Sequence, residues 1–304
     1  MSTGTDPLAP LAQLPGVPDA VAEVRKAVDR LYGHRVMRRR AAEVTSESAL
    51  RGARASAALA GSDWSLEEVR RRSDFGADPE TRTVGAALRI AAEAGQLLSI
   101  WRHSPLQVLA RLHLLAVGDA DLVAGRPRQA GEDVEDLFPL ELKPAEGVAA
   151  DAAPVAATAA PAGPVPALPA APGAEEVAAR LDQLSRLLVA RADGQGVGTP
   201  ALVVSSIVHG ELLALRPFGS YNGLIARAAA RIVLIAEGLD PKSICPAEVG
   251  LVELGTDAYR RALAGYLAGT PEGLAAWIGH CGRALRLGVR ESTAVCEAMQ
   301  RGMV

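Results

Sequence analysis

Apolar residues recur three and four positions apart along most of the chain, which is the spacing of one face of an α-helix. One such stripe is Val21, Val24, Val28 and Leu31. From this pattern we predict helices over about 19–32, 50–60, 82–101, 105–116, 175–188, 200–215, 224–237, 256–267, 271–287 and 291–301. No stretch shows the alternation of apolar and polar residues typical of paired strands, so the predicted fold class is all-α.

Residues typical of helix ends support several of these boundaries. Asp19 is expected to cap the first helix, and Gly61 to end the helix over 50–60. Ser65 is followed three residues later by Glu68, the capping-box pattern that starts a further short helix. Ser104–Pro105 combines a cap residue with a first-turn proline. The boundaries therefore have a physical basis beyond periodicity.

A stretch rich in Ala, Pro, Val and Gly, from Ala145 to Ala174, interrupts the helical pattern. Its repeated prolines exclude helix and central strand, and few of its side chains have apolar bulk to bury. We place a linker or surface insertion at 141–174, after a loose N-terminus at 1–16 and a first set of helices at 17–140. The remainder, 175–304, holds a central helix–loop–helix and the C-terminal helices. Whether the insertion covers a cleft is open at this point.

Composition excludes several classes of function. Apolar residues make up 49% and the net charge is -3, so no global field favours nucleic acid or anionic lipid. The run His34–Arg40 is basic, but aromatics are only 3% of the chain, so we interpret the run as a solvated helix face. Three widely spaced cysteines lack metal-binding spacing and indicate reduced thiols. With no signal-peptide pattern and no long apolar run, we expect a cytoplasmic protein that does not enter a membrane.

The stretch best suited to chemistry is the central loop, residues 216–223, with the sequence RPFGSYNG. Its glycines and Asn222 can turn backbone N–H groups toward an anion, and the helix that follows directs its positive dipole end to the same place. Candidate anion- or nucleotide-binding residues are Arg216, Gly219, Asn222, Gly223 and Arg227. No metal-ligating set is present in this stretch.

The central loop resembles the signature of the Fic (Fido) family, H-x-F-x-(D/E)-G-N-G-R-x-x-R. Phe218, Asn222, Gly223 and Arg227 match it, and Pro217 is also usual there. The positions that depart are Arg216, Ser220, Tyr221 and Leu224. The resemblance implies an all-α Fic-like bundle and a family activity, the transfer of AMP or related nucleotide groups to protein hydroxyls.

Further segments of the chain are similar to the family in the same order. Leu112–His113 followed by Gly125–Arg128 resembles a Leu-His segment that leads to a Gly-x-x-Arg turn, and 55–69 resembles the N-terminal Ser-Ser-x-Ile-Glu-Gly segment. His209 lies where members often have a helix histidine, and Tyr259–Ile278 resembles the following helix pair. Similarity extends from about 45 to about 290.

The departures remove the family's chemistry. In the family, a histidine at the place of Arg216 accepts the proton of the attacking hydroxyl, and an acid at the place of Ser220 holds Mg²⁺. An arginine has a pKa above about 12 and is no base at neutral pH, and a neutral hydroxyl is a poor ligand for Mg²⁺. Tyr221 replaces a glycine of the phosphate cradle, and Leu224 replaces the first arginine. The family's restraining glutamate corresponds to Ala60.

Other titratable groups do not replace the lost base. His209 lies two helical turns, about 10 Å, before Arg216, so we interpret it as a structural histidine. His113 is expected to be a core or interface histidine, and the phenol of Tyr221 is a weak base candidate because its ordinary pKa is about 10.

Three functions remain open. The first is a degenerate Fic-fold protein, a pseudoenzyme without cofactor, that binds an unknown protein partner or an anion such as a nucleotide or phosphate. The second is a nucleotide transferase with altered chemistry, which would use ATP and Mg²⁺. The third is a nucleic-acid or regulatory adaptor built on the run 34–40, which the net charge disfavours.

Overall fold

The computed structural model describes residues 6–118, 124–148, 164–194 and 198–303, and every regular element within them is a helix. The prediction of an all-α fold is confirmed. The elements are η1 (Ala9–Gln13), α1 (Val17–Tyr32), α2 (Met37–Leu59), α3 (Leu66–Arg71), α4 (Pro79–Glu93), η2 (Ala94–Leu97), α5 (Leu98–Trp101), α6 (Pro105–Val117), α7 (Ala174–Ala192), α8 (Ala201–Leu215), α9 (Asn222–Ala236), α10 (Ala247–Leu254), α11 (Thr256–Ala268) and α12 (Pro271–Gln300).

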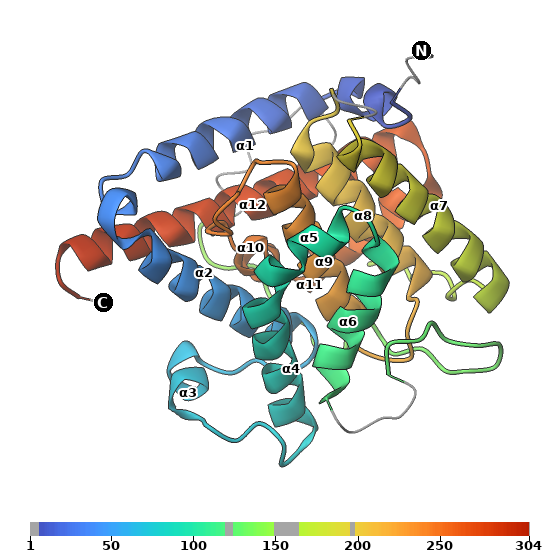
Figure 1. Cartoon of the computed structure of the whole chain (residues 1–304), viewed down its shortest axis with the longest axis horizontal. Helices are drawn as coiled ribbons and strands as arrows, with labels where there is room; N and C mark the ends of the chain where they lie inside the picture. Colours follow the sequence, from blue (N-terminus) through green and yellow to red (C-terminus); the bar gives the residue numbers. More distant parts are fainter. Residues whose placement is uncertain (1–5, 119–123, 149–163, 195–197, 304) are drawn as a thin grey trace.

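The antiparallel pair α8 and α9 lies at the centre of the bundle, surrounded by the other helices (Figure 1). α8 is mostly apolar and is buried along almost its whole length, as expected for a helix without a solvent face. Its neighbour α9 is similarly buried, yet it contains two arginines, Arg227 and Arg231. These two central helices therefore place charged groups inside the core.

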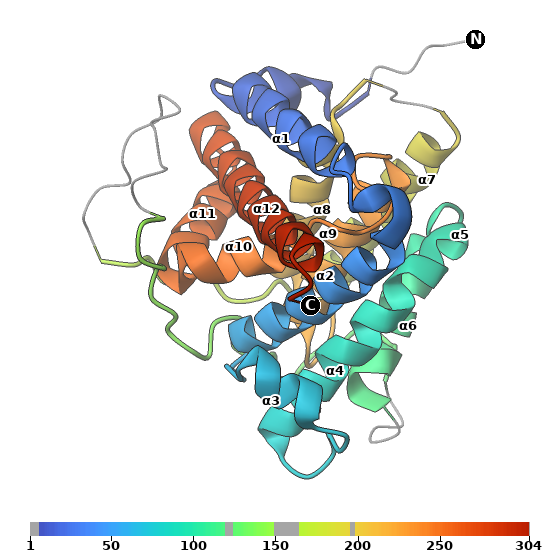
Figure 2. The same ribbon diagram turned by 90° about the vertical axis from the view of Figure 1, so that its left-hand side faces the viewer.

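Two groups of buried residues pack around this pair. One joins α2, α4, α6 and α7, with residues of α10, α11 and α12, to the central helices, and the other joins α1, α2 and α12 to them. In Figure 2, α1 lies alongside α12, while α4 and α6 lie together on the other side. Each of the two groups thus contains residues from before and after the Ala/Pro-rich stretch. The predicted division of the chain into the segments 17–140 and 175–304 stays a prediction.

Helix α10 packs very closely on α12 through glycines. A Cβ at Gly250 would clash with the backbone of Ala284, and a Cβ at Gly288 would clash with the backbone of Pro246. Only glycine allows this backbone approach. The sequence prediction missed α10, because its eight residues give too few turns for the helical spacing of apolar residues to be recognised.

Several predicted helix ends need correction. Gly16, in a left-handed conformation, precedes α1 and Asp19 lies inside its first turn, so Asp19 is not the cap. Ser104 precedes α6 without a side-chain capping bond, although Pro105 is in the first turn as predicted. The predicted break near 287–291 is absent, since α12 is a single helix of 30 residues. The Ser65–Glu68 capping box is confirmed.

Two stretches without regular structure lie near the central loop, 124–148 and 164–173. The second is the described end of the Ala/Pro-rich stretch; residues 149–163 lie outside the described part. Carbonyl groups of 164–173 accept hydrogen bonds from arginines of the neighbouring segments, for example at Pro164 from Arg261. None of the described helices has the length and apolarity that crossing a membrane requires.

Candidate functional site

The central loop is fixed by its own side chains. Asn222 accepts a hydrogen bond from the Phe218 N–H through Oδ1 (2.9 Å) and donates from Nδ2 to the Phe218 carbonyl (2.7 Å). Its side chain is 1% exposed. The Asn222 amide group therefore closes the loop.

Two residues of the loop have the left-handed conformation that usually favours glycine. Arg216 has φ 44° and ends α8, and Tyr221 has φ 59° and precedes α9. A non-glycine residue in this region costs of order 1–3 kcal/mol. Tyr221 thus adopts the positive φ that the glycine of the Fic signature would adopt cheaply, and the loop keeps its turn at an energetic cost.

Phe218 anchors the loop in the core. Its ring stacks on the imidazole of His113 with centroids 4.3 Å apart, and His113 Nδ1 accepts the Gly125 N–H at 2.9 Å. Both side chains are buried. The interpretation of His113 as a core histidine is consistent with this position, which connects α6 to the loop.

The first turn of α9 already holds an anionic group of the same chain. The carboxylate of Glu135 accepts hydrogen bonds from the backbone N–H groups of Tyr221, at 2.6 Å, and of Asn222. The sequence analysis assigned the Asn222 N–H to an external anion, whereas Tyr221 was not among its candidate anion-binding residues. Glu135 lies in 124–148, which sequence reasoning did not connect with the loop.

Two opposing effects act on the pKa of Glu135. Burial is the largest and raises the pKa of this carboxyl, whereas the hydrogen bonds from Tyr221 and Asn222 and the charge of Arg227 lower it. The net direction is upward. The carboxylate is therefore held beside α9 at a desolvation cost that its partners offset only in part.

Arg216 is turned toward the Ala/Pro-rich stretch. Its Nη2 donates to the Pro169 carbonyl at 2.7 Å, and its own carbonyl accepts from Arg128 Nε at 2.9 Å. Arg128 also donates its backbone N–H to the Pro217 carbonyl and its Nη2 to the Pro172 carbonyl. Burial, followed by the charge of Arg128, lowers the pKa of Arg216, but a guanidinium still cannot act as a base.

Arg227 is buried against α2. Nε donates to Ser56 Oγ at 2.8 Å and Nη2 donates to the Ser56 carbonyl at 2.9 Å. A Cβ at Gly223 would lie 3.0 Å from Arg227 Nη1, so the glycine gives this guanidinium its space. Ser56 lies one helical turn before Ala60, the position corresponding to the family's restraining glutamate, so the N-terminal segment does meet the second arginine. Leu224, in place of the first arginine, is 2% exposed within the core.

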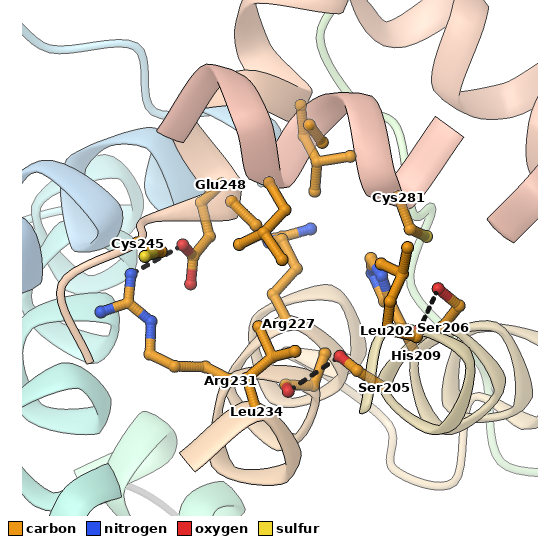
Figure 3. A pocket seen from close by; sticks show the side chains of 15 residues that line it. Leu202, Ser205, Ser206, His209, Arg227, Arg231, Leu234, Cys245, Glu248 and Cys281 are labelled. Carbon is orange, nitrogen blue, oxygen red and sulfur yellow. Dashed lines mark hydrogen bonds and ion pairs between the residues drawn. The ribbon is translucent and has the colours of Figure 1, made fainter. Parts of the chain in front are cut away.

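A small internal cavity of about 40 Å³ lies between α8, α9, α10 and α12. In Figure 3, Arg227 and Arg231 reach toward it from α9, while Ser206 and His209 approach from α8. Arg231 is paired with Glu248 at 2.8 Å, both nearly buried. A cavity of this size has room for about three water molecules, not for a nucleotide.

His209 belongs to the packed interior. Its Nε2 lies 2.6 Å from the Tyr259 hydroxyl, and its ring lies against Trp277. Burial, together with the charges of Arg227 and His280, lowers the pKa of His209 to about 3. The neutral imidazole of His209 thus shares a hydrogen bond with the Tyr259 hydroxyl inside the core, which agrees with a structural histidine.

The residues at the loop do not fit a magnesium ion. Ser220 offers one neutral hydroxyl, and both oxygens of the nearby Glu135 are occupied by backbone N–H groups. Within the described ranges no three His, Cys, Asp or Glu side chains are grouped as metal ligands. Mg²⁺ needs a nearly complete octahedron of oxygens with at least one carboxylate in typical phosphate sites.

The structure adds three residues that the sequence analysis did not assign to the site: Glu135, Ser56 and Arg128. Ser56 and Arg128 lie in the segments 55–69 and 125–128, which were matched to the family without any contact to the central loop or α9. For Glu135 the one signal was charge, because 132–136 reads Glu-Asp-Val-Glu-Asp and the central loop carries arginines. Opposite charges of this kind favour a contact but do not identify it.

No protein-family model matches the sequence, and no curated protein matches it. Solved structures share its fold. A Fic family protein from Desulfovibrio desulfuricans G20 has a TM-score of 0.66 over 92% of this chain and 75% of that chain, at 21% identity. A fragment of Fic-1 from C. elegans has a TM-score of 0.56 over 93% of this chain and 73% of that chain, at 15% identity, and a variant of this fragment has the same TM-score and identity. The predicted Fic fold is confirmed.

Proposed function

We propose that this chain is a Fic-fold pseudoenzyme that acts by binding and does not transfer AMP by the family's route. The observation that carries the proposal is the position of Arg216. The guanidinium at the place of the family's base donates to the Pro169 carbonyl and has Arg128 as its neighbour. A general base needs a pKa near the working pH and reach to the reacting hydroxyl, and Arg216 lacks the first.

The rest of the loop supports the same conclusion. Its Tyr221 N–H donates a hydrogen bond to the Glu135 carboxylate, and the Asn222 side chain donates one to the Phe218 carbonyl. Arg227 donates a hydrogen bond to the Ser56 hydroxyl. The donor set is unsuited to Mg²⁺. Loss of a base and of charge stabilisation each typically costs about 10²–10⁴-fold in rate. Hydrogen bonds within the chain thus use groups of the loop that a nucleotide would otherwise contact.

A transfer assay tests the proposal. Purified protein is incubated with cell lysate, Mg²⁺ and α-labelled ATP, and we expect no labelled protein above the level given by Arg227→Ala. Label that appears with the natural chain and disappears with Arg227→Ala would overturn the proposal and favour a transferase with altered chemistry.

A restoration variant makes a negative result informative. Arg216→His, Ser220→Asp and Tyr221→Gly together return the base, the acid and the glycine of the Fic signature, while the buried Leu224 is kept. With Glu135→Ala added, the α9 amides are also freed. Label from this variant, with none from the natural chain, would assign the inactivity to these positions.

A further inference from the structure

A surface hollow of about 370 Å³ lies beside α3, at the outer edge of the molecule (Figures 1 and 2). Its volume is within the range typical of ligand pockets. We call it the Trp64 hollow; it is lined by Trp64, Glu68, Arg71, Arg72, Ser73 and Asp74. The central loop contributes none of these residues, so the Trp64 hollow is separate from the site described above.

The indole ring of Trp64 is both accessible and fixed. Of the three tryptophans, all in the described part of the chain, only Trp64 is partly exposed, whereas Trp101 and Trp277 are buried. Trp64 packs against the apolar core, its Nε1 donates to Glu80 Oε2 at 3.4 Å, and its carbonyl accepts from Arg54 Nε at 2.6 Å. Tryptophan is enriched among the residues that anchor protein interfaces. A fixed and partly open indole in a hollow is therefore suited to binding a ligand group.

A cation of the same chain covers one face of this ring. Arg72 Cζ lies 4.9 Å from the centre of the Trp64 ring, which is a cation–π contact. Arg72 is exposed and acts electrostatically on Glu68, whereas its neighbour Arg71 forms an ion pair with Glu67 at 2.8 Å. Cation–π contacts at exposed sites are weak, so another guanidinium can replace that of Arg72.

The charges of the Trp64 hollow favour a cation. Glu68 and Asp74 bring two carboxylates to it. When Arg72 leaves the ring, the only positive charge that remains in the lining is Arg71, which Glu67 offsets. An anion would then meet a net negative charge, whereas a cation would meet a complementary one. The guanidinium is the cation whose fit over the ring Arg72 already shows.

We propose that the Trp64 hollow binds an arginine side chain of another protein, whose guanidinium replaces that of Arg72 over the indole ring. This inference rests on the proposed binding function and names one surface through which it acts. A side chain that covers the ring lowers the apparent affinity to the fraction of molecules in which the ring is free. If Arg72 covers the ring in about four molecules of five, its removal strengthens binding about fivefold.

The probe is N-acetylarginine amide, a single arginine without charged termini, and N-acetylcitrulline amide is its neutral counterpart of similar shape. NMR follows the indole N–H signal of Trp64, which is assigned by its loss in Trp64→Phe. In the natural chain we expect this signal to move with the arginine probe and not with the citrulline probe. Arg72→Ala should bind the arginine probe about fivefold more tightly. Arg71→Ala removes the same charge from the same hollow and should bind it like the natural chain.

Three results would overturn the inference. The first is a Trp64 signal that the arginine probe leaves unmoved in Arg72→Ala. The second is an equal response to the citrulline probe, which would show stacking without selection for a cation. The third is an equal gain of affinity in both alanine variants, which would show only the effect of net charge. Both substitutions are at exposed positions, and the signals of the buried Trp101 and Trp277 verify the fold in the same spectra.

The two proposals can fail separately. Transfer of label by the natural chain removes the pseudoenzyme proposal but leaves the arginine titration valid. An unmoved Trp64 signal without any label removes the arginine-binding surface and leaves the pseudoenzyme.

Discussion

Helix α9 binds two carboxylates in different ways. Glu248, from the regular helix α10, pairs with the buried Arg231 in the interior. Glu135, from a stretch without regular structure, accepts hydrogen bonds from backbone N–H groups at the N-terminal end of the helix. The first contact holds a charge that has no other partner among the described carboxylates within salt-bridge distance. The second holds backbone N–H groups that carry no net charge, so the loss of the carboxylate should cost less there than beside Arg231.

Removing the interior carboxylate should have the largest effect. Glu248→Gln leaves the Arg231 guanidinium buried without its ion pair, and we expect the free energy of unfolding to fall by about 3–5 kcal/mol. Chemical denaturation measures this. Glu253→Gln on the same helix removes only a surface pair with Arg290 and should cost about 0–1 kcal/mol. Similar losses in both would show that Glu248 does not hold Arg231 as described.

The next effect concerns the frame of the loop. Asn222→Ala leaves the buried N–H and C=O of Phe218 without their partner, and we expect a loss of about 2–3 kcal/mol. Ser220→Ala, in the same loop, should change stability by less than about 0.5 kcal/mol. Comparable melting temperatures for the two variants would contradict the structural assignment of Asn222.

Two glycines of the loop should differ. At Gly223 a methyl group would press on Arg227 Nη1, and we expect Gly223→Ala to cost about 1 kcal/mol, after allowance for the better helix propensity of alanine. Gly219 is exposed and an added Cβ meets only the Asp133 carbonyl at 3.9 Å. Gly219→Ala should be neutral within about 0.5 kcal/mol in the same denaturation measurement. A larger loss of stability in Gly219→Ala than in Gly223→Ala would contradict the close contact described between Gly223 and Arg227.

The smallest stability effect is expected at Glu135. Burial raises the pKa of the Glu135 carboxyl above its ordinary value of 4.5, so the folded protein binds this proton more tightly than the unfolded chain does. The free energy of unfolding that comes from this protonation is therefore fully present below pH 4.5 and is lost as the pH rises through the raised pKa. Glu135→Gln should remove this decline and change stability at neutral pH by less than about 1 kcal/mol. A loss as large as that of Glu248→Gln would make Glu135 a structural residue and remove the contrast.

The sequence predicted the helices of the interior better than the contacts at the N-terminal end of α9. The stripes of α7, α8 and α9 and the capping box at Ser65 follow from local spacing and local hydrogen bonds, and both could be recognised. Glu135 and Ser56 reach the loop and α9 from 86 and 171 positions away. Contacts over such separations depend on how the elements pack, which periodicity does not describe. The signature residues of the loop indicated the fold, but not that their side chains would be bonded within the chain.

The burial of Leu224 limits which side chains this position can accept. Leu224 has 2% of its surface exposed and is part of the apolar interior. An arginine placed there would bring a guanidinium among aliphatic side chains at a cost of several kcal/mol. The neighbouring helices would have to repack before the added charge could act on a ligand. The packing at Leu224 therefore resists a charged side chain at the start of α9.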